Sequence, residues 1–275
     1  MLWQNKLTSP NLRTRDIDVK SRGPLTYRNL NLLRELVRRD FQARFAGSAL
    51  GLFWAVLQPL SMVLMYWFVF TYMFGRGPGS NPHYFEFLIA GLLPWLGIAE
   101  GLSRSTTVIV ENAPMVRKLA FRSELLVVVP NASAILFEAI GLSLFVISLV
   151  GRGMTPRYIY LLPFAFAIQM AIQVGLGWIL AVTHVFFRDL GQILGFALSL
   201  GLYLSPILYQ PSEKFAALFV WNPMTPLLGL FRSALLSSAL PAASSIVFLL
   251  FVAIALFTGG LLFFRRAQAT LADLI

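Results

Sequence analysis

The segment 27–74 reads YRNLNLLRELVRRDFQARFAGSALGLFWAVLQPLSMVLMYWFVFTYMF and joins a basic helix to a long apolar run. In its first half, apolar residues recur at helical spacing along one stripe, and polar and basic residues occupy the opposite face. This pattern predicts an amphipathic interface helix at residues 27–46 that lies along a membrane surface. The candidate site residues of this helix are Arg38, Arg39, Phe41 and Arg44. It also fits an ordinary helix packed on a protein core. Residues 50–74 are long enough to cross about 30 Å of hydrocarbon.

The composition excludes a soluble domain. Of the 275 residues, 57% are hydrophobic and 12% are charged, and the mean hydropathy is +0.73. A chain of this length with so few charges cannot cover its surface in water, so we expect a polytopic membrane protein. The absence of cysteine excludes disulfides, thiolate catalysis and cysteine metal sites.

We expect an all-α membrane fold in three parts: a basic cytoplasmic tail at 1–26, the interface helix at 27–46 and one six-span domain at 47–275. Apolar runs separated by helix breakers predict crossings at residues 50–74, 85–110, 125–150, 159–185, 190–209 and 246–264.

The segment 215–240 is apolar, but Asn222-Pro223 and Pro226 break it into pieces that are each too short to span a membrane. We therefore expect a re-entrant hairpin that enters from the outer side and lies against the translocation path. Asn222 should turn the chain, and Arg232 should point to a polar path or to anionic headgroups. The candidate outer-gate residues are Asn222, Pro223, Pro226 and Arg232.

The distribution of positive charge agrees with this topology. The predicted arrangement places 17 Lys and Arg residues inside and 5 outside. This bias follows the positive-inside rule and places both termini in the cytoplasm. It also accounts for the net charge of +10 without a nucleic-acid partner.

Several short motifs follow one another in a fixed order. They are RRDFQARF at 38–45, SALGLFW at 48–54, QPL at 58–60, NAPMVRK at 112–118, FRDL at 187–190, WNP at 221–223, FR at 231–232 and the tail FR at 264–265 with AD at 272–273. In order and spacing they resemble the permease subunits of ABC type-2 exporters that carry bacterial surface polysaccharides, namely O-antigen, capsule and teichoic acid. Two features depart from the family pattern: Arg122 stands where the family has Pro, and the N-terminal tail is longer.

The resemblance implies a homodimer in the bacterial inner membrane that exports a lipid-linked polysaccharide. ATP and Mg²⁺ would be held by two copies of a separate ATP-binding-cassette subunit. The sequence contains no Gly-x-x-x-x-Gly-Lys-Ser/Thr, which is the motif that holds ATP phosphates, so we expect no cofactor site on this chain. We also expect no catalytic residue on it. The candidate ATPase-docking residues are Met115, Arg117, Lys118, Leu119, Phe121, Arg188 and Asp189. A plain solvated loop, and a structural ion pair between Arg188 and Asp189, are the alternative interpretations.

Ionisable and aromatic residues inside the predicted crossings are candidates for the transport path. Glu100 and Arg104 are four residues apart and should pair along one helix. Glu138 should face the dimer interface, the channel, or a polar partner such as Gln169 or Gln173, and the alternative is a hydrogen-bonded acid without a role in transport. The candidate channel-lining residues are Tyr66, Phe70, Glu138, Tyr203 and Tyr209. The aromatic residues 66–74 also fit an interfacial aromatic belt.

Two other functions compete with polysaccharide export. One is export of a drug or small lipid within the same superfamily, and the other is a membrane-embedded glycolipid enzyme. The enzyme is disfavoured because His83 and His184 lack a second ligand at metal spacing and because paired aspartates for magnesium chemistry are missing.

Overall fold

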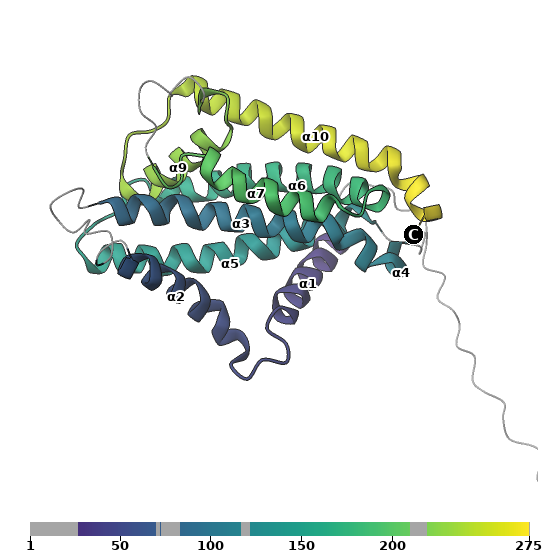
Figure 1. The fold of residues 1–275 in the computed structure, drawn as a ribbon, viewed down its shortest axis with the longest axis horizontal. Coiled ribbons are helices and arrows are strands. Elements are labelled where there is room, and N and C mark those ends of the chain that lie inside the picture. Colours follow the sequence, from purple (N-terminus) through teal and green to yellow (C-terminus); the bar gives the residue numbers. More distant parts are fainter. Residues whose placement is uncertain (1–26, 70–71, 73–82, 117–121, 210–218, 275) are drawn as a thin grey trace, which may run out of the picture.

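The computed structural model describes residues 27–69, 72, 83–116, 122–209 and 219–274, and within these ranges it contains helices and turns but no strand (Figure 1). In chain order the elements are α1 (Tyr27–Ala43), η1 (Gly51–Phe53), α2 (Trp54–Phe68), α3 (Tyr84–Glu111), α4 (Ala113–Val116), α5 (Glu124–Gly151), η3 (Ile159–Leu161), α6 (Leu162–Phe186), α7 (Leu190–Leu204), α9 (Met224–Leu236) and α10 (Ala243–Leu274). The all-α prediction is confirmed for the described part of the chain.

Helix α1 has the two faces that its sequence predicts. Val37 and Phe41 are half-buried and Phe45, just beyond the helix, is buried, whereas Arg38 and Arg39 are exposed. The apolar stripe packs against α5. Protein therefore covers at least part of the face that the sequence assigned to a membrane surface.

Four helical segments are long and apolar enough to cross a membrane: Tyr84–Glu111, Glu124–Gly151, Ile159–Phe186 and Ala243–Gln268. They coincide with four of the predicted crossings. In Figure 1, α3, α5, α6 and α10 lie lengthwise in one bundle, and the most extensive helix contacts join α6 to α10 and α3 to α5. An apolar cluster in their interior includes Leu142, Phe145 and Ile172, together with Phe231 of α9.

The two remaining predicted crossings correspond to shorter apolar helices. Helices α2 and α7 each contain 15 residues. Helix α7 ends at Leu204, short of the predicted boundary at Tyr209, because Ser205 precedes Pro206 and takes an extended backbone conformation with φ −101° and ψ 150°. The positions that would continue α2 at 70–71 and 73–74 lie outside the described residues.

The helix ends gather at two ends of the bundle. Helix α4 and the C-terminal part of α10 lie at one end, and α9 lies at the other (Figure 1). At the first end, one apolar cluster joins the end of α3, the start of α5, the end of α6 and α10, with members that include Ile109, Val127, Trp178 and Phe264. The first end carries the predicted cytoplasmic side, and the α9 end carries the predicted outer side.

The contact between α6 and α10 depends on glycine. A Cβ atom on Gly260 would lie 2.2 Å from the carbonyl oxygen of Gly175, and a Cβ atom on Gly175 would lie 2.5 Å from the carbonyl group of Leu256. These backbones approach too closely for any side chain, as in other membrane helix pairs that pack through small residues. This contact holds α10 on the bundle.

The break in the predicted hairpin lies at Asn222-Pro223 and not at Pro226. Pro226 lies in the first turn of α9, where the missing N–H removes no helical hydrogen bond, so its prediction as a chain break is wrong. Residues 215–218, at the start of the predicted hairpin, lie outside the described ranges.

Candidate functional site

Helix α1 is tied to α3 by two ion pairs of opposite polarity. Arg104 Nη2 lies 2.5 Å from Asp40 Oδ1, and Arg44 pairs with Glu100. Asp40 on α1 and Arg44, the first residue after α1, meet Arg104 and Glu100 on α3 in reverse order, so each side offers one acid and one base to the other. The four side chains are between 19% and 35% exposed, so water screens these pairs less than pairs on an open surface. The ion pairs set the register of α1 on α3.

The predicted pairing of Glu100 with Arg104 along α3 is present but longer. Their nearest oxygen and nitrogen atoms are 3.8 Å apart. Arg44 also lies over the ring of Phe137 on α5, with 4.0 Å between the guanidinium carbon and the ring centroid. This arginine thus connects the end of α1 to two of the long helices, α3 and α5.

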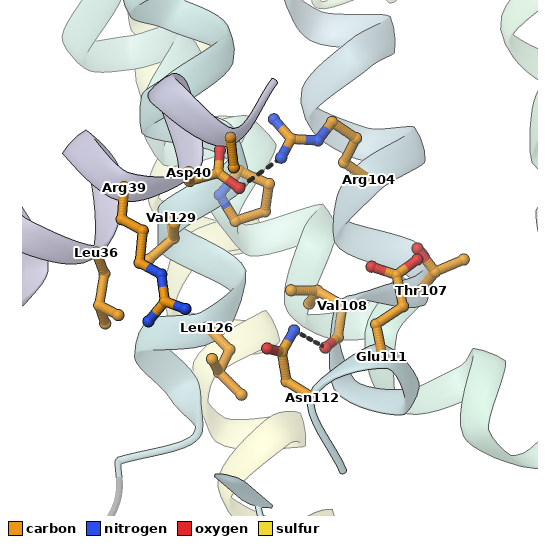
Figure 2. A pocket seen from close by; sticks show the side chains of 12 residues that line it. Leu36, Arg39, Asp40, Arg104, Thr107, Val108, Glu111, Asn112, Leu126 and Val129 are labelled. Carbon is orange, nitrogen blue, oxygen red and sulfur yellow. Dashed lines mark hydrogen bonds and ion pairs between the residues drawn. The ribbon is translucent and has the colours of Figure 1, made fainter. Parts of the chain in front are cut away.

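A cavity of about 340 Å³ lies between α1, α3 and α5, towards the α4 end (Figure 2). Figure 2 shows the Asp40–Arg104 pair at one side and Asn112 at the other, where the Asn112 amide donates to the carbonyl of Val108. Arg39 and Glu111 also line this space. The cavity therefore presents positively and negatively charged side chains to any group that enters from the end of α3.

Polar side chains are buried between α3, α5 and α6. Gln169 Nε2 donates to Glu138 Oε2 at 2.5 Å, and Gln173 Nε2 donates to the carbonyl of Gly97 at 2.9 Å. Nearer the α4 end of the bundle, Asn131 on α5 donates to Ser105 Oγ on α3 at 2.7 Å. These side chains are at most 3% exposed. These buried polar side chains therefore form some of their hydrogen bonds within the protein, as burial in a bilayer requires.

At the α9 end, Arg232 joins three segments. Its Nη2 donates to the carbonyl of Ile207 at 3.1 Å, its Nε donates to the carbonyl of Phe87 at 3.4 Å, and its guanidinium carbon lies 3.5 Å from the centroid of the Phe87 ring. A Cβ atom on Gly91 would lie 2.6 Å from Nη2, so the absent side chain makes the space that Arg232 occupies. Arg232 thus anchors α9 to the start of α3 and to the segment after α7.

The segment around α9 is also fixed at both of its ends. The Asn222 side chain accepts from the N–H of Met224 at 2.9 Å and donates to the carbonyl of Leu204 at 3.2 Å, so it turns the chain into α9. Beyond α9, Ser237 Oγ accepts from the N–H of Arg157 at 2.9 Å. The chain from Leu204 to Ser237 therefore begins and ends at the same end of the bundle.

A family model described as ABC-2 type transporter matches residues 31–236 of the chain. The chain belongs to this family. The match runs from α1 through α9 and includes the residues of the α1–α3 ion pairs and Arg232.

Relatives of this ABC-2 transporter are similar over nearly their full length. The O-antigen export system permease protein RfbA of Klebsiella pneumoniae is 28% identical over 254 residues, which cover 89% of this chain and 95% of that protein. RfbA of Myxococcus xanthus is 28% identical over 90% of this chain and 97% of its own length. The polysialic acid transport protein KpsM of Escherichia coli is 23% identical over 86% of this chain and 94% of its own length.

The predicted docking residues of the ABC-2 chain are only partly described. Arg117, Lys118, Leu119 and Phe121 lie outside the described ranges, and Met115 belongs to the short helix α4. Arg188 and Asp189 are exposed in the turn between α6 and α7, and the structure places no ion pair between them. The docking role stays a prediction.

The predicted channel-lining residues do not form one group. Glu138 is buried within the bundle, whereas Tyr203 is 63% and Tyr209 is 38% exposed near the end of α7, where the Tyr209 hydroxyl donates to the Tyr203 carbonyl. Tyr66 is half-buried on α2 and packs against the apolar interior. Phe70 lies outside the described ranges. Glu138 lines a cavity between α2, α3, α5 and α7.

Sequence reasoning missed Asp40 and the pairing of residues 40 and 44 with 104 and 100. Asp40 and Arg44 carry opposite charges four residues apart, and Glu100 and Arg104 carry the same two charges in the same order, which is a signal for an ion-paired contact between the two segments. The pair of buried Glu86 with Arg152 at 2.6 Å had no comparable signal. Among the described residues no group of three possible metal ligands occurs.

Proposed function

We propose that this chain is the membrane-spanning subunit of an ATP-driven exporter that moves a lipid-linked polysaccharide, of the O-antigen or capsule type, across the bacterial inner membrane. The observation that carries the proposal is the similarity to O-antigen and polysialic acid export proteins over 94% to 97% of their own length. Membership of the ABC-2 transporter family supports the transport role, and it does not depend on which substrate is carried.

In this proposal, ATP and Mg²⁺ bind to a separate ATP-binding-cassette subunit. The sequence has no P-loop, and such a loop is the usual way to hold ATP phosphates in these motors. Two copies of the chain would form a homodimer and dock two ATPase subunits on the cytoplasmic loops. The candidate surface is α4 with the residues that follow it and the α6–α7 turn, which includes Arg188 and Asp189.

We further propose six crossings, with both termini in the cytoplasm. The four long apolar helices support four of them, and α2 and α7 would supply the other two with the residues that flank them. The contacts of Asn222 with Leu204 and of Ser237 with Arg157 support the predicted hairpin at 215–240, which would enter and leave on the outer side. A short helix at membrane depth is tolerated where protein surrounds its polar groups, as it does for Arg232.

Reconstitution tests the function. Vesicles that contain the chain with its ATPase partner should move a labelled lipid-linked polysaccharide across the bilayer only when ATP is supplied, and the mass of the glycan should not change. Vesicles with the chain alone should neither hydrolyse ATP nor move the glycan. Cleavage or extension of the glycan without ATP would support the glycolipid enzyme, and transport of a dye or drug in preference to the glycan would support the small-molecule exporter.

A further inference from the structure

A second cavity, of about 380 Å³, lies between α2, α3, α5 and α7 and contains Glu138. Gln58 and Ser103 in its lining are exposed, and Glu138 is 3% exposed. The cavity therefore leads from the protein surface to a carboxyl group in the middle of α5. Its volume lies in the range of small-molecule binding sites.

One oxygen of Glu138 has no hydrogen-bond donor among the described residues. Oε2 accepts from Gln169 at 2.5 Å, and Oε1 is buried without a hydrogen-bond partner among the described residues. A buried acceptor without a donor is unfavourable, and it is satisfied when a hydroxyl group reaches it. A Cβ atom on Gly97 would lie 2.1 Å from Oε2, so the absent side chain at Gly97 makes the space that the carboxyl group occupies.

The lining of the cavity argues for a neutral ligand with hydroxyl groups. The lining contains one guanidinium, Arg44, and two carboxyl groups, Glu100 and Glu138, and Arg44 is already paired with Glu100. No excess of positive charge is available for a diphosphate. An acyl chain would leave Glu138 Oε1 without a donor. The other walls are apolar and include Met62, Leu93, Leu96 and Leu198, which suit the C–H faces of a sugar ring.

We propose that this cavity binds one uncharged sugar ring of the exported glycan, with a sugar hydroxyl donating to Glu138. The proposal rests on the proposed function and adds a defined contact within each protomer. It assigns to Glu138 a role in binding, with Gln169 as the residue that orients its carboxyl group.

Gly195 on α7 gives a direct test. It lines the cavity and is exposed, and a Cβ atom there would meet nothing within 4 Å. Gly259 on α10 is the matched control, because it is also exposed with open space at its Cβ position and does not line the cavity. The chain has no cysteine, so Gly195→Cys and Gly259→Cys each create a single reactive thiol.

The experiment measures alkylation by N-ethylmaleimide in membrane vesicles depleted of ATP, so that glycans stay in the arrested exporter. Vesicles from cells that make the glycan are compared with vesicles from cells whose glycan assembly is blocked. The glycan should slow alkylation of Gly195→Cys about fivefold, which corresponds to about 80% occupancy, and should leave Gly259→Cys unchanged. Adding Glu138→Leu should remove this protection, whereas Glu138→Gln, which keeps an acceptor oxygen, should retain most of it.

Equal alkylation of Gly195→Cys with and without the glycan would overturn the inference, as would slowing of the same size at both positions. Full protection in the Glu138→Leu variant would also overturn it. Alkylation of Gly195→Cys that is slower than that of Gly259→Cys to the same extent in both kinds of vesicle would indicate that a lipid fills the cavity, and it would contradict binding of a sugar. In each of these cases, ATP-driven glycan transport in reconstituted vesicles would still support the proposed function.

Discussion

Exchange of the two charges at the C-terminal end of α1, Asp40→Arg with Arg44→Asp, is expected to abolish export or to remove the chain from the membrane. The variant places a second arginine opposite Arg104 and a second acid opposite Glu100, although the net charge stays the same. Opposed like charges in a half-buried contact cost several kcal/mol. The corresponding exchange on α3, Glu100→Arg with Arg104→Glu, should be equally damaging. Surface glycan and the amount of membrane-embedded chain are the two measurements.

Combining both exchanges should restore export, because each acid again meets a base. Coupling energies between contacting side chains reach about 3 kcal/mol, which is enough for a clear rescue. Recovery should be incomplete because the position over the Phe137 ring loses its guanidinium. A fourfold variant no better than either pair alone would show that the charges act separately, and the register of α1 on α3 would then need another explanation.

Replacement of Arg232 by Met is the second change with a large expected effect. It removes the hydrogen bonds to the carbonyls of Ile207 and Phe87, and a buried carbonyl left without a donor costs about 1–3 kcal/mol. The α9 end of the bundle should loosen, and export should fall at least about tenfold for a loss near 1.4 kcal/mol in the active arrangement. Binding of the ATPase subunit should persist, because its proposed dock lies at the other end of the bundle.

Two further variants separate this role from a loss of positive charge. Gly91→Leu should act like Arg232→Met, because a side chain at Gly91 would occupy the place of the guanidinium. Arg157→Met should have little effect, because the Arg157 side chain is exposed and its contact with Ser237 uses the backbone N–H. Strong loss of export in Arg157→Met, or normal export in Arg232→Met, would contradict the anchoring role.

Much of the fold was predictable because hydrophobic length and helix breakers act locally. The crossings predicted at 85–110, 125–150 and 159–185 match α3, α5 and the η3–α6 segment closely, since apolar runs of this length have few other stable arrangements in a bilayer. The end of α7 was missed, although Pro206 restricts the backbone of Ser205 by a rule that applies to any sequence.

The site was less predictable because it depends on which helices meet and in which register. Gln169 was correctly named as one possible partner of Glu138, since both are polar in apolar helices. The partners of Arg104 and Arg232 across the bundle were not found. Asp40 comes from α1, and the place of Arg232 is defined by Gly91 and by two carbonyl groups, which have no recognisable sequence pattern.

The side of the membrane reached by single cysteines tests the six-crossing architecture most directly. A membrane-impermeant thiol reagent added to intact spheroplasts should label Thr155→Cys, Tyr209→Cys and Ser244→Cys, which are exposed around the α9 end. It should not label Asp189→Cys or Arg266→Cys until the membrane is permeabilised. Labelling of Tyr209→Cys and Ser244→Cys from opposite sides would make the α9 segment a full crossing and would contradict the proposed outer hairpin.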